Sequence, residues 1–499
     1  MFENKLIKLC QELSKKEMTR FREFALSPYF NKHEGVQKLV QYLHAIYPHF
    51  DARKCRREGL YQQIFPGEPH DQAKLALIFT YTQRLLDEFL MQAQFTEETQ
   101  LQRLLLLRRL RQRKWYDRYE KVIADALEDL QHTSSRGSVD LWYEAELAGE
   151  GDAYYAQTSA PKMAHHLHRK QVLLDRYYLA EKLRDACEMA VRRNIQKSDY
   201  AARLLEAALQ EVGAHPESYE TAPLVMIYYR LYLMLVQPSH AHYDEALLTF
   251  ERSLSQLPGE ELKTIFNFFQ NYCIRRINQG DERFLQEIFR LYRAQLEQNL
   301  LVEDGYLSEW HYKNIVTTAL RLREVDWVKT FIDQYAGRLS PEARANAYRF
   351  NLASYHYAVG QYDKVLELLV HVEYSDLRYN LGAKALLLRT YYDLEEFEAL
   401  HALAVSFRHY LQRRKLMADF RKQGYYNLFR FTRRAAFIKA NRPFRPAGDT
   451  QRNLSKLQQD IAAADAIFNK AWLVEKVGEL GGEGERGRGR EGGREGEKP

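Results

Sequence analysis

The residues best suited to binding chemistry lie between positions 408 and 445, where cations and aromatic rings alternate. This segment holds twelve Lys or Arg residues and one acidic residue, Asp419, so its net charge is +11, whereas the rest of the chain sums to −5. On a helical projection of this segment, an apolar stripe lies opposite a face of cations and aromatic rings. Phe429 also falls on the face of cations and rings. The residues of this face that we predict to bind an anionic partner are Lys422, Tyr426, Arg430, Arg433 and Phe437.

Three interpretations of this basic and aromatic face remain open. An ordinary solvated basic helix would need no partner. An acidic protein surface would pair with the cations, and the acidic remainder of this same chain could do so as an internal strap. A nucleic acid would place phosphates on the cations and stack bases on the rings.

Catalytic motifs are not found in the sequence. It contains no Walker-type phosphate loop, no GxGxxG before a helix, no HExxH and no GxSxG. The histidines at 165, 166 and 168 fit a solvated helix face, and His240 and His242 fall in a predicted loop beside Asp244. Two imidazoles without further ligands make a poor metal site. We therefore predict no enzymatic activity, no metal and no cofactor.

The composition points to helices that position these residues. The chain has 499 residues, of which 45% are hydrophobic and 28% charged, with only 13 Pro. Nine of the 24 Gly lie between 478 and 496, so the turn residues that a β-sandwich needs are scarce elsewhere. The four cysteines form no CxxC pair, and Arg230 interrupts the longest apolar stretch, 222–236. We predict a cytoplasmic protein that does not associate with membranes.

Stretches with a helical pattern of apolar residues alternate with loop-forming residues, and this alternation divides the chain into five segments. Asp71 can cap a helix in the first segment, and 97–131 reads as one long amphipathic helix. Breaks are expected at 132–138 and 149–161, and 451–477 reads as a single final helix. The predicted segments are an N-terminal helical module (1–95), a long-helix connecting region (96–216), helical repeats (217–445), a C-terminal capping helix (446–477) and a disordered Gly/Glu/Arg tail (478–499).

Large side chains recur at an interval of 35 residues in the third segment. Trp327, Tyr362 and Phe397 form one such column, and we expect them to occupy equivalent buried positions between successive helical hairpins. Ser340 followed by Pro341 suits a helix start, and Gly360 suits the left-handed position after that helix ends.

Two segments carry a resemblance to a known family. Residues 352–369 (LASYHYAVGQYDKVLELL) and 243–258 (YDEALLTFERSLSQLP) resemble tetratricopeptide repeats, and longer stretches resemble an uncharacterised family of bacterial helical-repeat proteins. The resemblance implies an all-α fold, a right-handed α-solenoid of antiparallel helix pairs. It implies a non-enzymatic scaffold that binds a protein partner, here unidentified. Nucleic-acid or polyanion binding through 408–445 is the alternative function, and an unrecognised enzyme is the second alternative.

Overall fold

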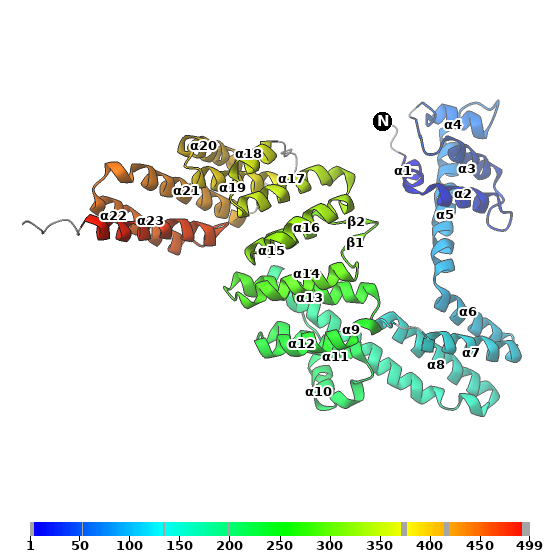
Figure 1. Cartoon of the computed structure of the whole chain (residues 1–499). Helices are drawn as coiled ribbons and strands as arrows, with labels where there is room; N and C mark the ends of the chain where they lie inside the picture. Colours follow the sequence, from blue (N-terminus) through cyan, green and yellow to red (C-terminus); the bar gives the residue numbers. More distant parts are fainter. Residues whose placement is uncertain are drawn as a thin grey trace, which may run out of the picture. The chain divides into compact units, whose positions relative to one another are not determined.

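The protein is built almost entirely from α-helices, as the computed structural model shows (Figure 1). The structure describes residues 4–51, 53–132, 135–196, 200–370, 377–413 and 419–491. The predicted all-α class is confirmed, because within these ranges the strands amount to one two-stranded hairpin, β1 (Val302–Glu303) and β2 (Tyr306–Leu307). No helix in the described ranges is long and apolar enough to cross a membrane. The chain divides into two compact units, Met1–Pro258 and Gly259–Pro499. The finer five-segment division stays a prediction.

The first unit begins with a helical module. Its helices are α1 (Lys5–Glu12), α2 (Lys15–Leu26), α3 (Glu34–Ile46), α4 (Arg57–Ile64) and α5 (Gln72–Glu97). The Asp71 carboxylate accepts hydrogen bonds from the amides of Ala73 and Lys74, so the predicted cap is confirmed. Apolar side chains from all five helices, among them Phe21, Leu39 and Leu86, form one buried core.

The rest of the first unit is a run of longer helices, and here two sequence predictions are wrong. The helices are α6 (Thr99–Gln112), α7 (Tyr116–His132), α8 (Ser138–Thr158), η1 (Pro161–Met163), α9 (His166–Gln196), α10 (Leu205–Ala214), η2 (Pro216–Tyr219), α11 (Pro223–Val236), α12 (His240–Ser253) and η3 (Leu254–Gln256). The expected long helix 97–131 is split, because Lys114 adopts a left-handed conformation with φ 58° and reverses the chain. The expected break at 149–161 is helical as far as Thr158.

A close packing contact explains the glycine within α8. A Cβ atom on Gly151 would lie 2.6 Å from the ring of His166, so only glycine lets α8 approach the start of α9 this closely. The loop prediction treated this glycine as a turn former, whereas it serves helix packing.

The second unit consists of successive helices that pack against one another. They are α13 (Gly259–Asn278), α14 (Arg283–Glu297), α15 (Glu309–Arg321), α16 (Val325–Tyr335), η4 (Ala336–Arg338), α17 (Pro341–Ala358), α18 (Tyr362–Val370), α19 (Leu377–Asp393), α20 (Phe397–Arg413), α21 (Asp419–Asn441), η5 (Arg442–Phe444), α22 (Ala447–Ala463) and α23 (Lys470–Glu491). Ser340 caps α17 through the Ala343 amide, as predicted.

One turn geometry recurs between the paired helices of this unit. A residue with positive φ follows α13, α15, α17 and α19: Gly280, Arg323, Gly360 and Glu395. In each turn the next amide donates to the carbonyl five residues before it, for example from Gln361 to His356 and from Glu396 to Tyr391. This is the Schellman arrangement, which satisfies carbonyls at the end of the first helix. The same bond, from Trp115 to Leu110, joins α6 to α7.

The positions of these turns correct the predicted aromatic register. Gly360 and Glu395 are 35 residues apart, but Arg323 and Gly360 are 37 apart. Val325, not Trp327, is therefore the counterpart of Tyr362 and Phe397. All three rings of the predicted column are half-buried instead of buried. Trp327 packs at the helix surface against Phe289 and Phe331, with ring centroids 4.9 and 5.2 Å away.

The chain's last segment also differs from the prediction. The single helix expected over 451–477 is two helices, α22 and α23, separated at Ala464–Asn469. Helix α23 continues to Glu491 into the segment expected to lack order, whereas residues 492–499 lie outside the described residues. Buried Leu473, Val477 and Leu480 hold the first turns of α23 in place, and extending an existing helix costs less than starting one.

Candidate functional site

Helix α21 carries the predicted binding residues, and contacts on two sides fix its position. On one side it meets the connection between α22 and α23. The Asn427 side chain donates to the carbonyl of Ala466 across 2.9 Å, and the Phe468 amide donates to the carbonyl of Gly424. A Cβ atom on Gly424 would lie 2.8 Å from the Phe468 ring, so this contact also depends on glycine.

On the other side α21 packs against α20. Phe429 stacks on Phe407 with ring centroids 4.0 Å apart and is buried. The prediction that Phe429 lies on the exposed face is therefore wrong. The helical projection assumed one buried stripe, but α21 is covered by α20 and by α22 and α23, so its exposed arc is narrower.

The five predicted residues differ in how far they reach solvent. Arg430, Arg433 and Phe437 are exposed, and the Phe437 side chain is 55% exposed. Lys422 and Tyr426 are half-buried. The Arg430 guanidinium lies 4.5 Å from the Phe431 ring centroid and 6.0 Å from that of Tyr426. Arg414 and Lys415, which contribute to the +11 charge, lie outside the described residues.

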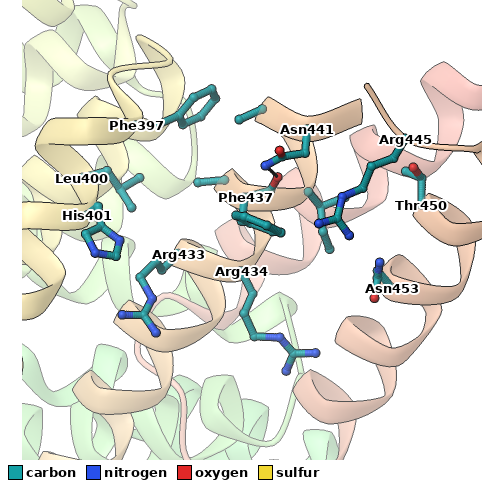
Figure 2. Close-up of a pocket in the computed structure, with 13 residues that line it drawn as sticks. Phe397, Leu400, His401, Arg433, Arg434, Phe437, Asn441, Arg445, Thr450 and Asn453 are labelled. Carbon is teal, nitrogen blue, oxygen red and sulfur yellow. Dashed lines mark hydrogen bonds between the residues drawn. The ribbon is translucent and has the colours of Figure 1, made fainter. Parts of the chain in front are cut away.

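The C-terminal half of this face opens into a hollow of about 490 Å³, which we call the arginine hollow. In Figure 2, Phe437 lies between side chains of α20, such as His401, and side chains that come after α21 in the sequence, such as Arg445 and Asn453. The lining residues are Phe397, Leu400, His401, Arg433, Arg434, Ala436, Phe437, Ile438, Ala440, Asn441, Arg445, Thr450 and Asn453. Three arginines and two phenylalanines thus share one hollow, and no carboxylate is among its lining residues.

The arginines of the hollow are not equivalent. Arg434 donates to Asp460 of α22 across 2.5 Å, and this hydrogen bond lowers the pKa of Asp460. Arg433 and Arg445 form no ion pair within the described part of the chain. Arg445 lies 5.2 Å from the Phe437 ring centroid, in the range of a cation–π contact. Two cationic groups therefore stand unneutralised beside an exposed ring.

The internal-strap interpretation applies to some cations of the segment and not to others. Arg434 pairs with Asp460, and Lys439 pairs with Glu395 across 2.8 Å. Arg430 and Arg433 form no such pair among the described residues. The charge of the segment is therefore partly used to fasten α21 to its neighbours and partly left on the exposed face.

The histidines take different positions from those expected. His165 and His168 are exposed, as predicted, but His166 is buried. Burial, with His165 and Arg169 nearby, lowers the pKa of His166 to about 4. His240 and His242 lie in the first turn of α12, which Ser239 caps, and not in a loop. Among the residues that the structure describes, no three His, Cys, Asp or Glu side chains are grouped to hold a metal.

Several lining residues of the hollow were not predicted from the sequence to bind a partner, and Phe397 was expected only in the buried aromatic column. Phe397 and His401 come from α20, and Thr450 and Asn453 come from α22. Only the packing of three helices brings them beside Arg433, so no local pattern in the sequence could have identified them.

Comparison with known proteins adds no relative, because no family model, curated protein or solved structure matches this chain.

Proposed function

We propose that this protein is a non-enzymatic scaffold that binds an acidic protein partner through the arginine hollow and the adjoining face of α21. The paired helices of the second unit stack, in this proposal, as a right-handed α-solenoid of the tetratricopeptide type. The recurring Schellman turn supports that part, since one supersecondary unit is repeated. The cytoplasmic setting stays a prediction.

The observation that carries the proposal is the lining of the hollow. Arg433 and Arg445, which form no ion pair with any residue that the structure describes, lie on either side of Phe437 in the sequence, and no lining residue is acidic. Exposed ion pairs contribute only about 0–1 kcal/mol each, so cations alone would give weak binding. Burying an exposed aromatic ring supplies the larger share, and aromatic and Arg side chains are enriched at the energetic centres of interfaces. A partner segment with carboxylates on either side of an apolar side chain matches this arrangement.

The same features favour a protein over a nucleic acid at this site. Single-stranded nucleic acids need a track of several cations free to pair with phosphates, beside an exposed ring on which a base stacks. Here Arg434 and Lys439 are already neutralised by carboxylates, and Phe397 is half-buried while Phe437 is exposed. Asn453 and Thr450 add neutral polar groups suited to a peptide backbone.

Affinity capture with a matched pair of variants tests the proposal. The site variant carries Arg433→Glu and Arg445→Glu. The control carries Arg321→Glu and Arg338→Glu, which reverses two other exposed cations of the same unit. Quantitative mass spectrometry should find acidic proteins that the parent and the control retain and that the site variant loses at least tenfold. Equal retention by all three proteins would contradict the proposal, and retention that nuclease treatment removes would indicate a nucleic acid instead.

A further inference from the structure

The turn between α6 and α7, in the first unit, exposes a tryptophan among cations. Trp115 is 61% exposed and follows the left-handed Lys114. It directly precedes α7, where Ser, Thr, Asp or Asn would supply a capping oxygen and Trp does not. The local backbone therefore gives no reason for an indole at this position. Within the described ranges, no aromatic ring stacks on it.

The cations of α6 and α7 separate into two sets. The first set is half-buried and forms ion pairs: Arg103 pairs with Asp129, Arg108 pairs with Glu146 and Glu150, and Arg111 pairs with Glu150. The second set is exposed and forms no ion pair in the part of the chain that the structure describes. Its members, which with Trp115 we call the α6–α7 tip, are Arg109, Arg113, Lys114, Arg118 and Lys121.

The ion pairs of the first set show that acidic side chains lie within reach of cations on α6. Glu150 is 8% exposed and accepts hydrogen bonds from Arg108 and Arg111 at 3.1 and 2.9 Å. These bonds fasten α6 to α8. The cations of the tip have no such structural role, and Asp117, the acidic residue nearest to Trp115 in sequence, is exposed and forms no ion pair within the described residues.

We propose that the α6–α7 tip binds single-stranded nucleic acid, with a base stacked on the Trp115 indole and phosphates paired with Arg113, Lys114 and Arg118. An exposed ring beside unpaired cations is the arrangement that sequence-tolerant single-strand binding uses, and each stacked base is worth about 1–3 kcal/mol. Arginine also matches phosphate oxygens with two donors at once. This site goes beyond the proposed function, because it lies in the other unit and takes another ligand.

Two other anionic partners fit the tip less well. The affinity of a protein for a membrane surface scales with the apolar area that it buries there. Among the described residues between Leu106 and Val139, Trp115 is the one large apolar side chain that is exposed. The tip would therefore bury one ring. Aromatic residues at the energetic centre of a protein interface fill well-packed pockets, and Trp115 lines none of the five best-formed hollows of the described structure.

Binding of labelled oligonucleotides to the full chain tests this inference. The probes are a 15-nucleotide oligothymidylate, the corresponding duplex, phosphatidylserine vesicles and polyglutamate. We expect the single strand to bind and to quench tryptophan fluorescence in the parent but not in Trp115→Phe, while the other four tryptophans give a constant background. Trp115→Ala should weaken binding at least tenfold, whereas Trp310→Phe, at another exposed tryptophan, should not.

Salt dependence provides a second readout. Replacing Arg113 and Lys114 by Glu should lower the slope of log K against log salt by ~0.7 for each phosphate that the variant no longer neutralises. Arg433→Glu with Arg445→Glu should leave oligonucleotide binding unchanged, which separates this inference from the proposed function. No binding of the single strand, equal binding of the duplex, or binding unaffected by Trp115→Ala would overturn it. In the Arg433→Glu and Arg445→Glu variant, which lacks the proposed site for acidic proteins, stronger binding to vesicles or polyglutamate than to the single strand would also overturn it.

Discussion

The Lys476 ammonium of α23 lies 3.3 Å from the carboxylate of Asp393 at the end of α19. The Tyr357 hydroxyl of α17 donates to the other oxygen of the same carboxylate. Asp393 therefore joins three helices that are far apart in the sequence, and its carboxylate is only 7% exposed. Burial alone would lower the pKa of Lys476, but Asp393 and Glu479 raise it overall. The final helix is thus fastened by charge as well as by apolar packing.

Removing this carboxylate should destabilise the second unit. Asp393→Ala leaves the hydroxyl of half-buried Tyr357 and the Lys476 ammonium without their shared acceptor, so we expect a loss of about 2–4 kcal/mol in the free energy of unfolding. Urea titration measures this change. Glu479→Ala removes an exposed partner of the same lysine and should cost no more than about 1 kcal/mol. Equal effects of the two variants would show that Asp393 has no special role.

The recurring turn predicts opposite effects for two substitutions. Gly360 has φ 74° and open space around its Cβ position, so Gly360→Ala should cost about 1 kcal/mol through backbone strain alone. Arg323 is held at φ 62° without glycine, and Arg323→Gly should therefore stabilise the unit by up to about 1 kcal/mol.

A glycine outside the turns serves as the control for these substitutions. Gly337→Ala also enters open space but without a positive φ, and it should not destabilise the protein. Urea titration of the three variants measures the effects. A loss of stability in Arg323→Gly, or none in Gly360→Ala, would contradict the assigned turn geometry.

The buried His166 should make the first unit sensitive to acid. Because the folded-state pKa is about 4 and the unfolded value is about 6.5, the unfolded chain binds the proton first as the pH falls below about 6.5. The stabilisation that neutral His166 contributes to the folded state is therefore complete above about pH 6.5 and is lost progressively as the pH falls toward 4. Between pH 7 and pH 5 the loss amounts to about 2 kcal/mol.

Comparison of two histidine variants isolates this effect. The parent should lose about 2 kcal/mol more than His166→Gln on going from pH 7 to pH 5, because the variant lacks the titrating group. His168→Gln, at an exposed histidine, should keep the pH dependence of the parent. Urea titration at both pH values gives the comparison, and identical pH dependence in the parent and His166→Gln would rule out a buried neutral imidazole.

Sequence patterns predicted the helical class and some local detail. Asp71 and Ser340 cap helices as expected, because capping depends on neighbouring residues. The break at Lys114 could not be predicted in this way, because a lysine in the left-handed region carries no glycine signal. For the same reason, the turn at Arg323 could not be predicted from the sequence. The interval between the turns at Arg323 and Gly360 is 37 residues instead of 35, and Trp327 was therefore placed in the wrong register.

The candidate site was predicted only in outline. Charge segregation and periodicity identified Arg430, Arg433 and Phe437 as exposed, since these properties follow from one helix. The burial of Phe429 and the contribution of Asn453 depend on how α20 and α22 pack against α21. Such contacts join residues distant in the sequence, and a single sequence holds no direct record of them.

Site-specific photocrosslinking at Phe437 tests the central claim most directly. A photoreactive phenylalanine analogue at this exposed position should crosslink to an acidic protein segment in cells that produce the protein. Adding Arg433→Glu and Arg445→Glu should remove the product. The same analogue at Ile274, an exposed apolar residue elsewhere in the unit, should give no such product. Failure to crosslink any protein at Phe437, or a product that persists after charge reversal, would contradict the proposal that the arginine hollow binds an acidic partner.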